Sequence, residues 1–106
     1  MSFSLNSIFD NRKILKSGFP VNADKVICES GLKLSVQASG FHYCSPRENE
    51  GPYTAVEVGF PSHEVAELMP YAENPSNPTD TVYGYVPVEI VESIILKNGG
   101  IKGGAK

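Results

Sequence analysis

The sequence predicts a single α+β domain with a three- to four-stranded sheet, and three observations lead to this prediction. Residues 32–39 and 53–60 alternate apolar and polar side chains, as half-buried strands do. A proline precedes the amphipathic run VEIVESIILKN, as at the start of many helices. The chain has 106 residues, enough for one two-layer core and too few for a second domain.

Residues 1–23 are predicted to form an N-terminal extension or a short helix. Gly18 and Pro20 would end that helix. Because polar residues such as Asp10 weaken its helix propensity, the segment is equally compatible with an arm that becomes ordered only on packing. The apolar residues at near-helical spacing are Leu5, Ile8, Phe9 and Leu15.

The main domain is predicted to span residues 24–101 and to begin with a hairpin. DKVIC forms the first short strand, ESG the turn, and LKLSVQAS the second strand. The run GGIKGGAK at the end has no strand before it, so residues 102–106 are predicted to be a flexible tail.

Two strand-helix units are predicted after the hairpin. YTAVEVGF is followed by Pro61 and a helix that ends near Pro70, and TVYGYV is followed by Pro87 and a helix capped by residues 98–100. When the sequence is compared with itself at a shift of 26 residues, Pro61 aligns with Pro87. Any two strand-helix connections converge on such a pattern, however. We expect both helices to pack on one face of the sheet. The loop at residues 73–80 leaves the last strand free to run parallel to its predecessor.

Charge and hydropathy narrow the classes of partner. A formal net charge of −3 argues against binding of a nucleic-acid backbone, which needs clustered Lys and Arg. No stretch reaches the roughly 20 apolar residues that span a bilayer, and the first residues lack the order of a secretory signal. The expected compartment is the cytosol, where two cysteines normally stay reduced.

The stretch GFHYCSPRENEGPYT, residues 40–54, contains the candidates for chemistry. His42 and Cys44 are two residues apart and would share a strand face, as a base and a nucleophile need to do. No orienting acid or oxyanion frame accompanies them, so a Cys44-dependent enzyme is the weaker hypothesis. Cys28, Cys44, His42 and His63 lack zinc-type spacing. We therefore expect no catalytic residue, no metal and no cofactor.

A binding surface is the stronger hypothesis. Tyrosine offers contact area at little entropic cost, and Arg47 offers a charged anchor. Strand alternation predicts that Tyr83 and Tyr85 share one face, as do Tyr53 and Glu57. Packing of these rings over the sheet is an equally good explanation. Gly59 and Gly84 are candidate points where a helix or a ligand approaches the sheet closely. The candidate binding residues are His42, Tyr43, Arg47, Glu48, Tyr53, Glu57, Tyr83 and Tyr85.

Several strings, SVQAS, HYCSPR, GPYTAVEVGFPS, VYGYVPVEIV and NGGI, resemble a family of small proteins carried by tailed phages and prophages of proteobacteria. The resemblance covers about residues 32–101 and implies no particular activity. The resemblance implies a phage setting, in which small proteins without catalytic motifs often act by binding.

The expectation is therefore a phage accessory protein in the host cytoplasm that inhibits a host factor or an antiviral defence complex by direct protein contact. The expected contact surface is the loop at residues 42–53 together with Tyr83 and Tyr85. The alternative is a sponge that sequesters a nucleotide defence signal. It would use Arg47 or a nearby Lys for phosphate and a Tyr ring for the base, in a pocket shared by a homodimer.

Overall fold

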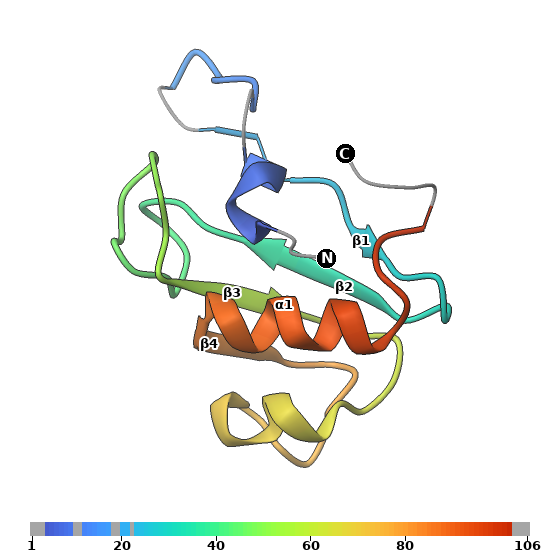
Figure 1. Cartoon of the computed structure of the whole chain (residues 1–106). Helices are drawn as coiled ribbons and strands as arrows, with labels where there is room; N and C mark the ends of the chain where they lie inside the picture. Colours follow the sequence, from blue (N-terminus) through green and yellow to red (C-terminus); the bar gives the residue numbers. More distant parts are fainter. Residues whose placement is uncertain (1–3, 10–11, 18–19, 22, 103–106) are drawn as a thin grey trace.

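A four-stranded sheet in the order β1-β2-β3-β4 forms the centre of the molecule (Figure 1). The structure is a computed structural model that describes residues 4–9, 12–17, 20–21 and 23–102. The α+β class predicted from the sequence is confirmed. Of the predicted tail, only Lys102 lies within the described residues.

The strands are β1 (Val26–Ile27), β2 (Lys33–Gln37), β3 (Ala55–Gly59) and β4 (Val82–Pro87). Each strand pairs antiparallel with the next one in the sequence. In this register Val36 lies opposite Val58, and both side chains are fully buried. The alternation read from the sequence therefore does place one face of β2 and β3 in the core.

The last strand, β4, runs antiparallel to β3. The parallel arrangement that the sequence had left open is therefore not formed. Residues 60–81 turn back along the outer edge of β4, where Glu73 N–H donates to the carbonyl of Val82 at 2.9 Å. Because the chain returns along the edge of the sheet and does not cross over its face, β3 and β4 run in opposite directions.

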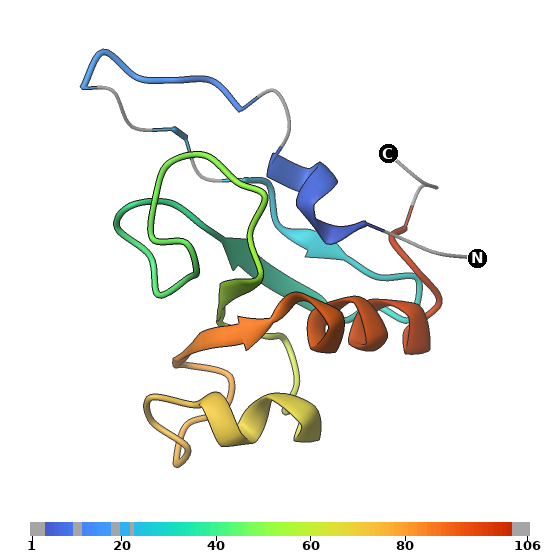
Figure 2. The ribbon, with the colours of Figure 1, turned by 60° about the vertical axis from the view of Figure 1, so that its left-hand side comes forward.

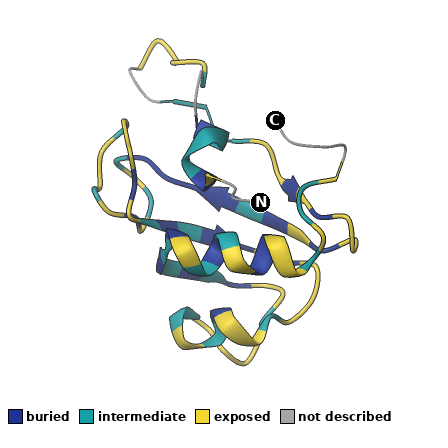
Figure 3. Ribbon diagram, in the orientation of Figure 1, coloured by how far each residue is buried: buried dark blue, intermediate teal, exposed yellow. Residues whose placement is uncertain are grey.

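Helix α1 (Val88–Lys97) covers the core face of the sheet, and its apolar side is dark blue in Figure 3. The predicted helix start is confirmed, since Pro87 is the N-cap. The predicted end is confirmed as well, because Gly100 at φ 83° donates its N–H to the carbonyl of Ile95 at 2.9 Å. Within the described ranges no helix is long and apolar enough to cross a membrane. The residues that α1 buries are Val88, Val91, Ile94 and Ile95.

The second helix expected on that face is instead a short 3-10 helix, η2 (Ala66–Tyr71). Pro70 lies inside this segment and has no N–H to donate, so a longer α-helix is not formed there. Seen from the side, η2 lies beside β4 while α1 lies over the sheet (Figure 2). Leu68 is its fully buried residue, and Lys97 of α1 bridges to Glu67 at 2.9 Å.

The N-terminal segment contributes another 3-10 helix, η1 (Leu5–Phe9). Leu5 is fully buried, and its N–H donates to Oε2 of Glu92 on α1 at 2.7 Å. The expected helix is thus only five residues long, and it packs beside α1. The part of the prediction that concerns residues 10–11 and 18–19 lies outside the described residues.

A β-bulge in β4 changes the faces of its two tyrosines. Val56 pairs with Val86 and Val58 pairs with Tyr83, so two residues of β4, Gly84 and Tyr85, lie opposite the single residue Glu57. Tyr85 takes a left-handed backbone conformation with φ 54°. The prediction that Tyr83 and Tyr85 share a face is therefore wrong, because the extra residue shifts the alternation by one.

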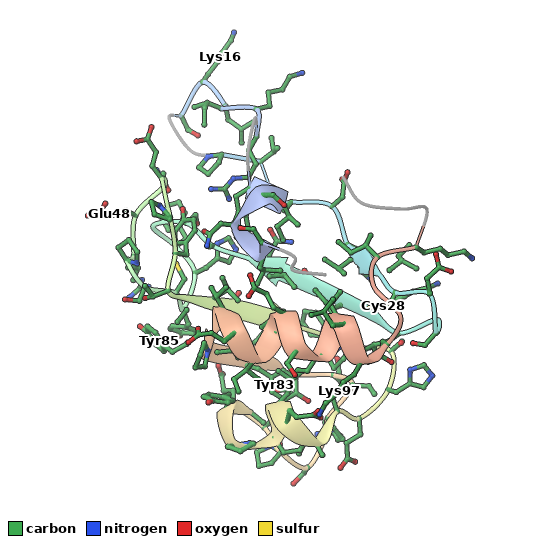
Figure 4. The ribbon with its side chains drawn as sticks, viewed as in Figure 1. Lys16, Cys28, Glu48, Tyr83, Tyr85 and Lys97 are labelled. Carbon is green, nitrogen blue, oxygen red and sulfur yellow. The ribbon has the colours of Figure 1, made fainter. Side chains whose placement is uncertain are left out.

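The two rings consequently have different environments. Tyr83 is fully buried between the sheet and the elements that cover it, and its hydroxyl donates to the carbonyl of Pro78 (Figure 4). Tyr85 is 49% exposed. Tyr83 is thus a core residue, and only Tyr85 of this pair remains available to a partner.

Alanine substitutions should separate the two tyrosines clearly. Tyr83→Ala empties a packed site and is expected to lower the free energy of unfolding by about 3–5 kcal/mol. Tyr85→Ala, the matched control two residues away, is expected to lower it by less than about 1 kcal/mol. Urea unfolding followed by circular dichroism measures both values. Equal losses for the two variants would contradict the bulge.

Candidate functional site

Tyr43, Arg47 and Tyr85 form a surface cluster that we call the tyrosine patch. The ring centroids of Tyr43 and Tyr85 are 6.0 Å apart, and Cζ of Arg47 lies 5.6 Å from the centroid of the Tyr43 ring. The tyrosines are 42% and 49% exposed. Two half-exposed rings and a guanidinium are therefore gathered at one place, which is the side-chain chemistry of protein contact sites.

Backbone contacts hold the patch against the bulge. Tyr85 N–H donates to the carbonyl of Tyr43 at 2.9 Å, and Tyr43 N–H donates to Oε2 of Glu57 at 3.4 Å. A Cβ on Gly84 would lie 3.1 Å from Cβ of Tyr43. A close approach does occur at Gly84, but the approaching group is the loop residue Tyr43 and not the predicted helix or ligand, whereas Gly59 has only ordinary contacts. The backbone of Tyr43 is thus held against the bulge.

Glu57 lies at the base of the patch and is half-buried. Its carboxylate binds the Tyr43 backbone, and its charge also acts on His42 and Cys44. It therefore positions the patch from within β3. Five of the eight predicted residues meet in this region: His42, Tyr43, Arg47, Glu57 and Tyr85.

His42 and Cys44 both bond to Ser39, and in different ways. Nδ1 of His42 lies 2.7 Å from Oγ of Ser39, whereas Sγ of Cys44 donates to the Ser39 carbonyl at 3.1 Å. Cys44 is almost fully buried, and burial raises the pKa of its thiol. Since the thiolate is the nucleophilic form, this environment is the reverse of the one that activates a cysteine.

Tyr53 and Glu48 lie apart from the patch. The expectation that Tyr53 shares a strand face with Glu57 is wrong, because β3 begins only at Ala55. Asn6 binds both the N–H and the carbonyl of Tyr53, and the Tyr53 ring turns edge-on to Phe9 with centroids 5.3 Å apart. Glu48 is exposed at the outer side of the loop, and its carbonyl accepts the Tyr53 hydroxyl at 2.8 Å (Figure 4).

Arg12 is a structural residue that no sequence pattern predicted. Its guanidinium donates to the carbonyl of Ala38 at 2.6 Å, to the carbonyl of Asn49 at 3.1 Å and to the hydroxyl of Tyr53 at 3.3 Å. These contacts tie the N-terminal segment to both ends of the loop that carries Tyr43 and Arg47. No local pattern signals them, because the partners are 26 to 41 positions away in the sequence.

Across residues 4–9, 12–17, 20–21 and 23–102, no group of three or more His, Cys, Asp or Glu side chains is arranged to hold a metal ion. Both cysteines are free and buried. The tyrosine patch itself offers two aromatic rings and the guanidinium of Arg47.

No protein-family model matches the chain, and no curated protein or solved structure is significantly similar to it.

Substitution of Gly84 tests the packing beneath the patch. Gly84→Ala places a methyl group 3.1 Å from Cβ of Tyr43, so Tyr43 must shift, at an expected cost of about 1–3 kcal/mol in the free energy of unfolding. Gly59→Ala is the matched control on the neighbouring strand, because its nearest contact is an ordinary 3.7 Å. The control should be neutral or stabilising by about 0.5 kcal/mol. Urea unfolding of the two variants measures this difference, and equal stabilities would contradict the contact.

Acidification should destabilise the fold through His42. Burial lowers the pKa of His42 from its ordinary 6.5, an effect that Glu57 opposes and Arg12 reinforces. Between pH 6.5 and the lower pKa of the folded state, His42 is protonated in the unfolded chain and neutral in the folded chain. Stability is therefore expected to fall as the pH drops through this window, and to fall less in His42→Asn. An NMR titration of the His42 ring that gives a midpoint of 6.5 or higher would contradict the lowered pKa.

Proposed function

We propose that this chain is a phage accessory protein that binds a host factor, or a component of an antiviral defence system, in the host cytoplasm and thereby inhibits it. The tyrosine patch is the contact surface in this proposal. No reaction is assigned to the chain.

The proposal rests chiefly on the pre-organisation of the patch. Tyr43 is held at its backbone N–H by Glu57 and at its carbonyl by Tyr85. Because these groups are already ordered, a partner loses little conformational entropy in binding them. Tyrosine and arginine are also the residue types that most often dominate the binding energy of protein contacts.

The phage and host setting comes from the motifs HYCSPR and VYGYVPVEIV, which contribute Tyr43, Arg47 and Tyr85 to the patch. The strings that resemble phage proteins are thus the same strings that build the surface. This coincidence supports a partner in the bacterial host, and it makes the patch the first place to look for that partner.

The nucleotide sponge has less support at this surface. A stacked base needs a free face on a tyrosine ring, and the guanidinium of Arg47 already lies over one face of the Tyr43 ring. A thermal-shift panel of cyclic nucleotides separates the two functions. A stabilisation that Arg47→Ala abolishes would favour the sponge.

The direct test is co-purification of the tagged protein from host cells, followed by mass spectrometry. A specific host protein should be retained by the wild type and lost with Tyr43→Ala and with Arg47→Ala. Each substitution is expected to weaken the complex by about 2 kcal/mol, which is roughly 30-fold in Kd.

Leu96→Ala is the control for this experiment, because Leu96 is a half-exposed apolar residue on α1. It should retain the same protein with unchanged affinity. A set of retained proteins that is identical for the wild type and all three variants would refute the patch as the contact surface.

A further inference from the structure

A hollow of about 510 Å³ lies between η1, the segment that follows it and residues 49–53. We call it the Arg12 hollow. Its volume is within the range of about 300–1,000 Å³ that is usual for small-molecule sites. Arg47 and the two tyrosines of the patch are not among its lining residues, so it is separate from the proposed contact surface. Its lining includes Phe9, Arg12, Ile14, Glu50, Pro52 and Tyr53.

Arg12 supplies a fixed positive charge to this hollow. Its three hydrogen-bond acceptors are two carbonyls and one hydroxyl, all of them uncharged. Burial raises the pKa of Tyr53, so the hydroxyl stays neutral at pH 7. Among the described residues the one salt bridge joins Lys97 and Glu67, so the Arg12 guanidinium has no carboxylate partner there.

A guanidinium has five N–H groups, and Arg12 uses three hydrogen bonds to its own chain. The plane of the group is already held, since Cζ lies 4.9 Å from the centroid of the Phe9 ring. The N–H groups that remain form no salt bridge within the described part of the chain. Both hydrogens of Nη2 are used, so the remaining N–H groups belong to Nε and Nη1, and each can donate one hydrogen bond to an anion.

The rest of the hollow is lined by both apolar and polar groups. Phe9 and Tyr53 form an edge-to-face aromatic pair, and Pro52 and Ile14 add aliphatic surface. Ile14 is 58% exposed, so its side chain is accessible to a ligand in the hollow. Burying this surface would stabilise a ligand that carries an apolar body next to its charge.

Glu50 limits the charge of that ligand. Its carboxylate lines the same hollow and is close enough to Tyr53 to act on its pKa. One arginine and one glutamate together give a formal charge of zero, which does not suit a polyphosphate. A ligand with a single negative charge can contact Arg12 with its carboxylate and keep that carboxylate away from Glu50.

We propose that the Arg12 hollow binds a small monocarboxylate with an apolar, ring-sized body, whose carboxylate contacts Arg12 and whose body packs against the exposed side chains of Ile14 and Pro52. This site is independent of the tyrosine patch and of the function proposed for it.

The test is an NMR titration of the full chain with two ligands that differ in charge and little in shape, phenylacetate and 2-phenylethanol. Phenylacetate should shift the amide signals of Gly51 and Tyr53 and bind more tightly than the alcohol. Adenosine monophosphate, with nearly two negative charges, should bind more weakly than phenylacetate. Arg12 itself is left intact, because its removal would also break three internal hydrogen bonds.

Two exposed positions provide variants that leave these bonds in place. Glu50→Gln removes a repulsive charge and should tighten phenylacetate binding by about threefold, while Ile14→Glu should weaken it by at least as much. The proposal is overturned if phenylacetate causes no saturable shift, or if the shifts map away from the hollow. It is equally overturned if the alcohol or the nucleotide binds as tightly as phenylacetate, or if Glu50→Gln changes nothing.

Discussion

The extra residue that β4 inserts opposite Glu57 determines which tyrosine the protein buries and which it exposes. Without it, Tyr83 and Tyr85 would point to the same side of the sheet. With it, Tyr83 joins Val56 and Val58 in the core, and Tyr85 meets Tyr43 at the surface. Bulges often re-aim a side chain next to a functional site, and the tyrosine patch is built directly upon this one.

The loop at residues 39–54 depends on contacts from distant parts of the chain. Tyr43 rests on Gly84 and binds the backbone of Tyr85. Arg12 holds the carbonyl of Ala38, just before the loop, and the carbonyl of Asn49 within it. A long polar loop with few apolar anchors would otherwise sample many conformations. These two attachments explain how such a loop presents an ordered surface, and why the N-terminal segment belongs to the same structural unit.

The elements that obey a local rule could be predicted from the sequence. Alternation located β2 and β3, and Pro87 with the Gly99-Gly100 pair located α1. The bulge could not be predicted, because a one-residue shift depends on how Tyr43 packs on Gly84. Arg12 was missed for a similar reason, since its partners are distant in the sequence. The second helix was over-predicted because Pro70, read as its end, lies inside a shorter 3-10 helix.

The opposite environments of Tyr83 and Tyr85 are the central claim, and nuclear Overhauser contacts of the two rings test it most directly. The Tyr83 ring should show contacts to the methyl groups of buried residues such as Val58 and Leu68. The Tyr85 ring should show contacts to the ring of Tyr43 and none to those methyl groups. If both tyrosine rings contact the same set of methyl groups, β4 has no bulge at Gly84 and Tyr85, and the tyrosine patch does not exist as described.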